Sequence, residues 1–231
     1  ATSDLDSIII KTVDGIETLA VDATLTGTDN ALNTSGILFT NINNASLNDG
    51  QLSGSAEADN FELVDTVSLK ANAITFTSIN SEIDAGSSAT SEIILDTITG
   101  TEVTAENFSV GNTAGSVSVN EFQFTNIEQV DAGAGAGDRV SSTADTAALS
   151  GGSKAITVSD IKFTDIDSVN LGDGILSGSD EADSFVLTSS VLTANDIVIN
   201  AINSTIDAKG GDDKVTGSAG VDWSLTTDNN S

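Results

Sequence analysis

The segment FTDIDSVNLGDGILSGSDEADSFVL, residues Phe163–Leu187, contains both of the short motifs from which the chain is built. The first motif, Phe-Thr-x-Ile-Asx/Glu, begins at Phe163, and the second, Ala-Asp-x-Phe-x-Leu, begins at Ala182. Both motifs return along the chain at similar spacing. Such self-similarity predicts a repeat protein, in which each unit buries its apolar face against its neighbours.

The copies of the two motifs define a module of about 40 residues. The first motif occurs as FTNIN, FTSIN, FTNIE and FTDID, and in weaker form as VDGIE and INAIN, so that modules start near residues 13, 39, 76, 124, 163 and 199. The second motif occurs as ADNFEL, AENFSV, ADTAAL and ADSFVL, with a divergent copy VDWSL at residues 221–225. It follows the first motif by 19 or 20 residues in three modules and by 29 residues in the module at Phe76, where we expect a loop or an extra strand.

The modules are themselves grouped into a longer sequence repeat. The segment from Gly36 aligns without a gap with the segment from Asp160, an offset of 124 residues, so that three modules make one large repeat. We therefore expect residues 1–231 to form a single repeat array. We also expect this array, which starts at Ala1 without Met, to be part of a longer chain or filament.

Local sequence predicts strands throughout. Small and β-branched residues alternate in short segments such as Ala155–Ile166 and Ser184–Ser189, and these are bounded by Gly, Asn, Asp and Ser. The chain has no Pro, which is excluded from central strands because it cannot donate to a ladder. We predict an all-β fold, a right-handed parallel β-solenoid with about 19–20 residues per coil, in which inward Phe and Ile stack on the same residue type one coil away. A β-sandwich or barrel would explain the alternation but not the 124-residue repeat.

Charge and composition restrict the ligands. The net charge of −28, from 35 acidic and 7 basic residues, disfavours nucleic acid and anionic membranes as partners. Carboxylate oxygens suit hard divalent cations, although the same charge also keeps an edge-rich β protein soluble. The chain has no Cys for disulfides or thiolate sites and no His as a general base, and no apolar run approaches a membrane span of about 20 residues.

Three segments combine Gly and Asp, namely residues 131–140, 170–183 and 207–218. They resemble the Gly-Gly-x-Gly-x-Asp nonapeptide of RTX proteins, in which glycine-rich turns hold calcium between coils. The resemblance implies Ca²⁺ as a cofactor and gives a set of candidate ligands: Asp138, Asp173, Asp180, Asp183, Asp212 and Asp213. Gly and Asp in these segments are equally suited to the corners of coils, without a metal.

The repeat pattern as a whole, including VDGIETLAVDATLTGTDN at Val13–Asn30, resembles the repeats of very large secreted bacterial proteins. These are RTX-like adhesins, surface-layer proteins and matrix filaments. The resemblance implies a secreted, cell-surface protein that acts as a scaffold, adhesin stalk or filament. It also implies self-association, end to end or side by side, and contact with cell-surface or matrix polysaccharide.

A carbohydrate-binding or polysaccharide-processing β-helix is the alternative function. Such proteins need carboxylates or basic residues clustered in a groove, whereas the seven basic residues of this chain are scattered. The acidic cluster Asp180–Asp183 has a counterpart at Glu57 and Asp59 in the other large repeat, which suits a structural position. We therefore predict that the protein is not an enzyme. An ice-binding surface would need Thr-x-Thr in every coil, and Thr24–Thr28 and Thr75–Thr77 are isolated.

Overall fold

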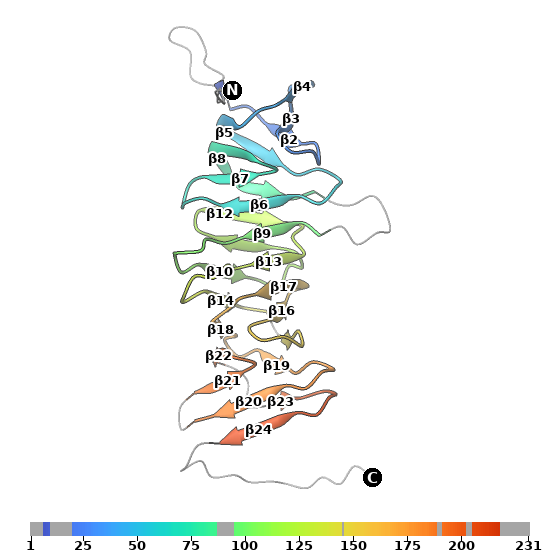
Figure 1. The fold of residues 1–231 in the computed structure, drawn as a ribbon, viewed down its shortest axis with the longest axis vertical. Helices are drawn as coiled ribbons and strands as arrows, with labels where there is room; N and C mark the ends of the chain where they lie inside the picture. The colour runs from blue at the N-terminus through green and yellow to red at the C-terminus, as the bar shows by residue number, and fades with distance from the viewer. Residues whose placement is uncertain are drawn as a thin grey trace, which may run out of the picture.

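The computed structural model of the chain describes residues 7–9, 20–86, 95–144, 146–188, 191–201 and 205–217. These residues form β-strands and turns, without a helix, and the strands stack into an elongated rod (Figure 1). The predicted all-β parallel solenoid is therefore confirmed. The motif copies at residues 13–17 and 221–225, and residues 87–94 of the longest module, lie outside the described residues.

All of the described strands are short except β5 and β8. Their bounds are β1 (Ser7–Ile9), β2 (Ala23–Leu25), β3 (Ala31–Thr34), β4 (Ile37–Thr40), β5 (Asn44–Ser53), β6 (Asn60–Leu63), β7 (Leu69–Ala71), β8 (Ile74–Asp84), β9 (Thr97–Thr99), β10 (Asn107–Val110), β11 (Val117–Val119), β12 (Phe122–Thr125), β13 (Gln129–Asp131), β14 (Arg139–Ser142), β15 (Thr146–Leu149), β16 (Ile156–Val158), β17 (Ile161–Thr164), β18 (Ser168–Asn170), β19 (Ile175–Ser177), β20 (Ser184–Leu187), β21 (Leu192–Ala194), β22 (Ile197–Asn200), β23 (Ile206–Asp207) and β24 (Lys214–Gly217).

An antiparallel three-stranded meander joins each described module to the next. The second motif forms its first strand and the first motif of the next module forms its third strand, as in β15, β16 and β17. Leu149 of β15 pairs with Ile156, and Ile156 pairs with Phe163 of β17. Two single strands, here β18 and β19, then lead to the next meander. The two sequence motifs therefore mark the two outer strands of the four described meanders from β6 to β22.

Strand pairing runs the length of the rod in two series, which we call ladder 1 and ladder 2. Ladder 1 is β1-β5-β8-β7-β6-β9-β13-β17-β16-β15-β19-β23, and ladder 2 is β4-β3-β2-β5-β8-β12-β11-β10-β14-β18-β22-β21-β20-β24. The long strands β5 and β8 belong to both ladders. In each ladder, parallel groups of up to four strands are separated by one antiparallel strand, the middle strand of a meander.

The coil is longer than predicted. Residues that hydrogen-bond between successive coils are separated in the chain by 30 positions at Asp183 and Asp213, and by 37 positions at Asp59 and Asp96. The short coil expected from the spacing of the two motifs is wrong because neither half of a module is a complete coil. The half from the second motif to the next first motif forms a meander within one ladder. The other half crosses between the ladders as two single strands.

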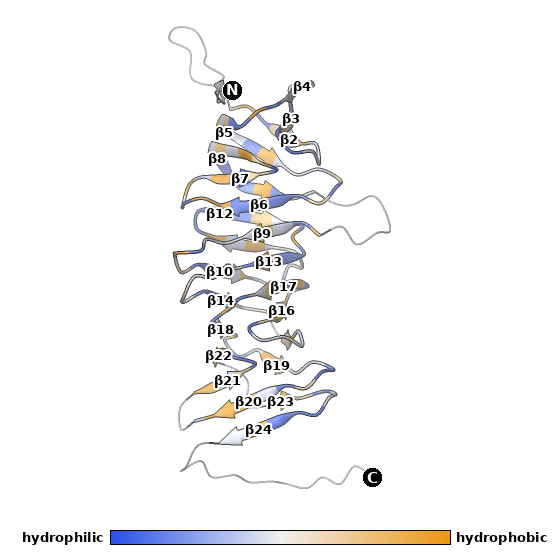
Figure 2. Ribbon diagram, viewed as in Figure 1, coloured by the Kyte–Doolittle hydropathy of each residue, from blue (hydrophilic) through white to orange (hydrophobic). Residues whose placement is uncertain are grey.

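The core lies between the two ladders and is filled by the motif phenylalanines. Phe61 of ladder 1 contacts Phe124 of ladder 2 with ring centroids 5.6 Å apart, and Phe108 of ladder 2 contacts Phe163 of ladder 1 at 6.0 Å. All four side chains are at most 1% exposed. The predicted stacking of Phe on Phe along the coils is wrong, because the register places Phe108 beside Val140. Figure 2 shows hydrophobic residues on strands such as β20 and β21, and hydrophilic residues in many of the turns.

The third residue of the first motif forms a corner. Its φ is positive in all five described copies, between 48° and 60°: Asn41, Ser78, Asn126, Asp165 and Ala201. Asn and Asp tolerate this left-handed conformation better than most residues. The turn sends the next residue, Ile, back toward the core, and this Ile is buried in the four copies where it is described. The Phe-Thr-x-Ile motif thus places a left-handed corner after the Phe-Thr pair, and in β8 the strand continues through this corner.

Hairpin turns connect one module to the next. Asn72–Ala73, Ser159–Asp160 and Asn195–Asp196 each have positive φ at both residues, as in type I′ turns. The carbonyl oxygen of the first turn residue accepts a backbone hydrogen bond from the preceding module. Lys154 N donates to Asn195 at 2.8 Å, and Gly115 N donates to Ser159 at 3.0 Å. The turns therefore contribute to the interface between modules.

Candidate functional site

Acidic residues stand directly before many strands of the parallel groups and form three rows along the rod. Row 1 precedes β6, β9 and β13, row 2 precedes β10, β14 and β18, and row 3 precedes β20 and β24. The members of row 1 are Asp59, Asp96 and Glu128; those of row 2 are Glu106, Asp138 and Asp167; and those of row 3 are Asp183 and Asp213. The parallel register places the members of each row side by side.

Hydrogen bonds between successive coils hold these rows in place. The backbone N–H of Asp59 donates to Asp96 Oδ1 at 2.8 Å, and the N–H of Asp96 donates to Glu128 Oε2 at 2.8 Å. The N–H of Asp183 donates to Asp213 Oδ1 at 3.0 Å in the same way. Each acid thus satisfies a backbone donor that lies just before the strand. The acidic residue at this position has an architectural role.

Two of these carboxylates are enclosed by protein donors. Asp59 accepts hydrogen bonds from Ser55 N at 2.5 Å and Asn72 Nδ2 at 2.5 Å. Asp183 accepts from Ser179 N and Oγ, and from Asn195 Nδ2 at 2.6 Å. The Asn in each case is the first residue of the meander's hairpin turn. Because both oxygens of these carboxylates are occupied, the acids are suited to joining turn and coil.

Glu106 and Asp138 in row 2 differ from this pattern. Glu106 Oε1 accepts from the hydroxyls of Thr101 at 2.6 Å and Thr104 at 2.8 Å, and Asp138 Oδ1 accepts from Glu106 N at 2.8 Å. The other oxygens, Glu106 Oε2 and Asp138 Oδ2, are buried without a hydrogen-bond donor. Burial raises the pKa of Asp138 to about 6; the hydrogen bond from the Glu106 N–H opposes this rise, and the carboxyl group of Glu106 adds to it. Oxygens in this state fit a hard cation of the kind that the RTX resemblance implies.

The carboxyl groups of the rows differ in the direction of their pKa shifts. Burial raises the pKa of Asp96 to about 7, and the charges of Glu128 and Asp59 add to the effect. In row 2, Lys154 forms an ion pair with Asp167 at 2.5 Å and holds the pKa of that carboxyl below its ordinary value. A positive charge therefore compensates one end of row 2.

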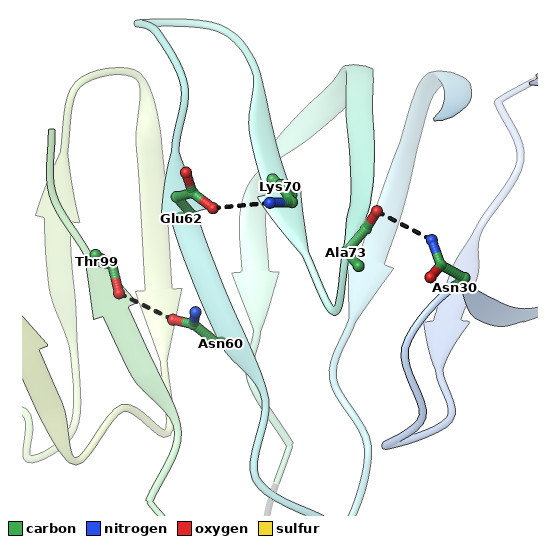
Figure 3. A network of polar contacts seen from close by, with 6 residues as sticks. All are labelled: Asn30, Asn60, Glu62, Lys70, Ala73 and Thr99. Carbon is green, nitrogen blue, oxygen red and sulfur yellow. Dashed lines mark hydrogen bonds and ion pairs between the residues drawn. The ribbon is translucent and has the colours of Figure 1, made fainter. Parts of the chain in front are cut away.

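Polar contacts on the outward surface join a meander to its neighbours (Figure 3). Lys70 of β7 pairs with Glu62 of β6 at 3.2 Å, and Thr99 of β9 donates to Asn60 of β6 at 3.0 Å. Asn30 Nδ2, from the preceding module, donates to the carbonyl oxygen of Ala73 at 3.2 Å. These contacts lie on exposed or half-buried side chains and set the register of neighbouring strands.

Glycine in the Ser-Gly-Ser and Thr-Gly-Thr segments allows close contact between coils. The N–H groups of Gly54, Gly100 and Gly178 donate to the main-chain carbonyl oxygens of Asp84, Asp131 and Asp207 of the next coil, each at 2.7 Å. A Cβ on these three residues would lie 1.8, 2.5 and 2.2 Å from the next carbonyl oxygen of that coil. In the predicted calcium segments, Gly178 therefore has an architectural role, and so do Asp131 and Asp207, whose side chains accept hydrogen bonds from the N–H groups of Gly133 and Lys209 at 3.1 Å.

The structure separates the predicted calcium ligands. Asp173, Asp180 and Asp212 are exposed, and Asp173 lines an open surface hollow of about 460 Å³. Asp183 and Asp213 meet through one backbone hydrogen bond. Asp138 lies in row 2 with Glu106. In the described part of the chain, no three acidic, Cys or His side chains gather in a position to share a metal ion. Calcium binding by the six predicted residues stays a prediction.

Sequence reasoning missed Glu106, Thr101 and Thr104. Glu106 occupies the Asp position of the second motif, in Ala-Glu-Asn-Phe, and this exchange of Glu for Asp was the one available signal.

Comparison with known proteins adds no assignment: no family model, curated protein or solved structure matches the chain. Among the described residues, no helix has the length and apolar character needed to cross a membrane.

Proposed function

We propose that this chain is an extracellular structural protein whose rod extends end to end to build a filament, an adhesin stalk or a surface layer at the cell surface. The two ends of ladder 2 carry the proposal. At one end β24 pairs with β20 only, and Val215 on β24 is 58% exposed. At the other end β4 pairs with β3 only, and Ile37 and Leu38 are 58% and 59% exposed. These pairings are those of the described residues.

Unpaired edges of this kind are templates for further strands. Parallel groups inside the rod contain four strands, as in β10-β14-β18-β22, whereas the described part of the terminal group contains only β20 and β24. Strands from a second copy would continue the group and cover the exposed apolar side chains. A filament formed in this way repeats the contacts already present between coils.

Charge favours growth at the ends over lateral packing. With a net charge of −28, parallel rods repel each other along their whole length, and the repulsion is screened by salt. The strand edges offer backbone hydrogen bonds and apolar area at either end. Side-by-side association and polysaccharide binding, which the sequence also predicts, then occur on the completed filament.

Negative-stain electron microscopy and sedimentation velocity of the purified chain test the proposal. We expect filaments of one rod width whose length increases with protein concentration. Val215→Lys places a charge on the exposed edge strand and should leave single rods. Val186→Lys is the matched control, because Val186 is also exposed but lies on β20, which is paired on both sides. Dispersed single rods of the unaltered chain at high concentration would refute end-to-end assembly.

A further inference from the structure

The turn before β10 and the turn before β14 bring an unusual number of oxygen atoms together. Glu106 is 3% exposed and Asp138 is fully buried, yet each has one carboxylate oxygen that accepts no hydrogen bond. The Thr101 and Thr104 hydroxyls lie 2.5 Å apart and both donate to the other oxygen of Glu106. Burying a carboxylate oxygen without a hydrogen-bond donor or a cation costs free energy. A cation bound between these two oxygens would therefore stabilise the arrangement.

The equivalent carboxylates of two other modules have hydrogen-bond donors on both oxygens. Asp59 and Asp183 hold the place of Glu106, and in both cases an Asn side chain and a Ser N–H complete the coordination of the carboxylate. The module of Glu106 has Glu102 where the others have Ser55 and Ser179, and Thr hydroxyls bind only one oxygen of Glu106. Among the copies of the second motif whose acid is described, this departure from the repeat coincides with the pair that carries the two free oxygens.

Basic side chains near this pair are engaged elsewhere. Arg139 follows Asp138 in the chain, but its Nε donates to Asn107 Oδ1 at 3.2 Å. Lys154 pairs with Asp167, the next acid of row 2. The two adjacent carboxylates of Glu106 and Asp138 are therefore not neutralised by either residue.

Gly135 shows where the oxygens converge. A Cβ on Gly135 would lie 3.0 Å from the carbonyl oxygen of Thr104, 3.3 Å from that of Thr101 and 3.4 Å from Asp138 Oδ2. Three oxygens from two separate turns thus surround the position that a side chain would occupy. The Glu106 side chain interacts with that of Asp138, so the two carbonyls and the two carboxylates can together supply the oxygen-only ligand set that Ca²⁺ prefers over transition metals.

We propose that Thr101, Thr104, Glu106 and Asp138 form a Ca²⁺ site that links two successive coils. Asp138 Oδ2, Glu106 Oε2 and the carbonyl oxygens of Thr101 and Thr104 are the protein ligands, and water completes the six to eight positions of the ion. The ion neutralises the two carboxylates and fastens the turn before β10 to the turn before β14. The site lies within one rod, so it is independent of end-to-end assembly.

Isothermal titration calorimetry with CaCl₂, on the full chain freed of metal with EDTA at pH 7.5, tests this site. We expect Glu106→Gln and Asp138→Asn each to remove one bound Ca²⁺ per chain or to weaken it at least tenfold. Asp183→Asn is the matched control, because Asp183 occupies the same position in a later module and its carboxylate is already hydrogen-bonded. This control should retain the full number of bound ions.

Thermal unfolding followed by circular dichroism provides a second readout. The melting temperature should rise with CaCl₂ and return to its starting value with EDTA, since a ligand that binds only the folded state stabilises it. In case a carboxylate variant does not fold, Gly135→Ala fills the space between the oxygens without changing a charge, and it should abolish the calcium response. Equal binding by the unaltered chain and Glu106→Gln would overturn the proposal. A melting temperature that responds to pH but not to calcium would also overturn it, because a shared proton would then fill the site.

Discussion

Replacing Gly54 by Ala should disrupt the close contact between successive coils. The N–H of Gly54 donates to Asp84 O at 2.7 Å, and an added Cβ would lie 1.8 Å from the carbonyl oxygen of Ala85 and 2.8 Å from Asp59 Oδ2. Neither the carbonyl, fixed in the backbone, nor the hydrogen-bonded carboxylate has room to move aside. The two coils must therefore separate at this point.

The cost follows from that separation. An opening of about 1 Å takes the hydrogen bond beyond its range of about 3.5 Å and forfeits about 1 kcal/mol. Forcing an extra methyl group into a closely packed site costs about 2 kcal/mol more. We expect Gly54→Ala to lower the free energy of unfolding by about 3 kcal/mol.

Urea unfolding followed by far-ultraviolet circular dichroism measures this loss. The matched control is Gly111→Ala, because Gly111 is exposed, has no positive φ, and its added Cβ would contact no other atom within 4 Å. The control should change the free energy of unfolding by less than about 0.5 kcal/mol. Equal unfolding curves for the two variants would refute the close stacking of Gly54 on Ala85.

Three further predictions concern the core, a turn and an acidic row. Phe108→Ala should lower the free energy of unfolding in urea by about 4 kcal/mol, because Phe108 is fully buried against Phe163. A loss below about 1 kcal/mol would place this ring outside the core. Ala73→Gly should stabilise the chain by about 0.5 kcal/mol, because Ala73 has a φ of 65° that favours Gly, and a lower melting temperature would argue against this turn. The pKa of Asp96 is raised from 3.8 to about 7, so the folded chain holds this proton more tightly than the unfolded chain. The protonated Asp96 contributes its full stabilisation below about pH 4, and this stabilisation is lost as the pH rises to 7. Asp96→Asn should therefore make the free energy of unfolding less dependent on pH across that range. An unchanged pH dependence would contradict the raised pKa of Asp96.

The solenoid could be predicted from the sequence because the two motifs mark repeated structural positions. The antiparallel direction of the middle strand in each meander could not be predicted. Middle strands such as β7 and β16 have only three residues each, and so short a strand alternates in the same way in parallel and antiparallel pairs. The hairpin turns also lack the Asn-Gly or Asp-Gly pair that commonly identifies a type I′ turn. Asn72–Ala73 and Ser159–Asp160 reach the required conformation without Gly.

The residues that surround Asp138 could not be identified from the sequence, for a related reason. The Gly-Asp pattern drew attention to Asp138, but its neighbour Glu106 stands far earlier in the chain, with a sequence separation of 32, and meets it only through the register of β10 and β14. The shorter coil expected from the motif spacing would have placed other residues beside Asp138. Long-range register depends on the whole stack, so local sequence identifies the residues that prefer corners but not the pairs that face each other.

The structure places the two copies of the 124-residue repeat on different ladders. Successive meanders lie on alternate ladders, so equivalent segments three modules apart lie on opposite ladders. Phe39 is on β4 of ladder 2, and Phe163, one large repeat later, is on β17 of ladder 1. Similar segments therefore occur on both ladders of the rod.

Spin labels on introduced cysteines test the two-ladder arrangement most directly, since the chain has no Cys of its own. Ser141 and Asn170 are paired on neighbouring strands of ladder 2, which lie about 4.8 Å apart in a sheet. Lys162 is nearer to Ser141 along the chain than Asn170 is, but it faces outward from ladder 1. We predict strong dipolar broadening for labels at 141 and 170, and none for labels at 141 and 162. Broadening only in the second pair would contradict the fold and restore the shorter coil.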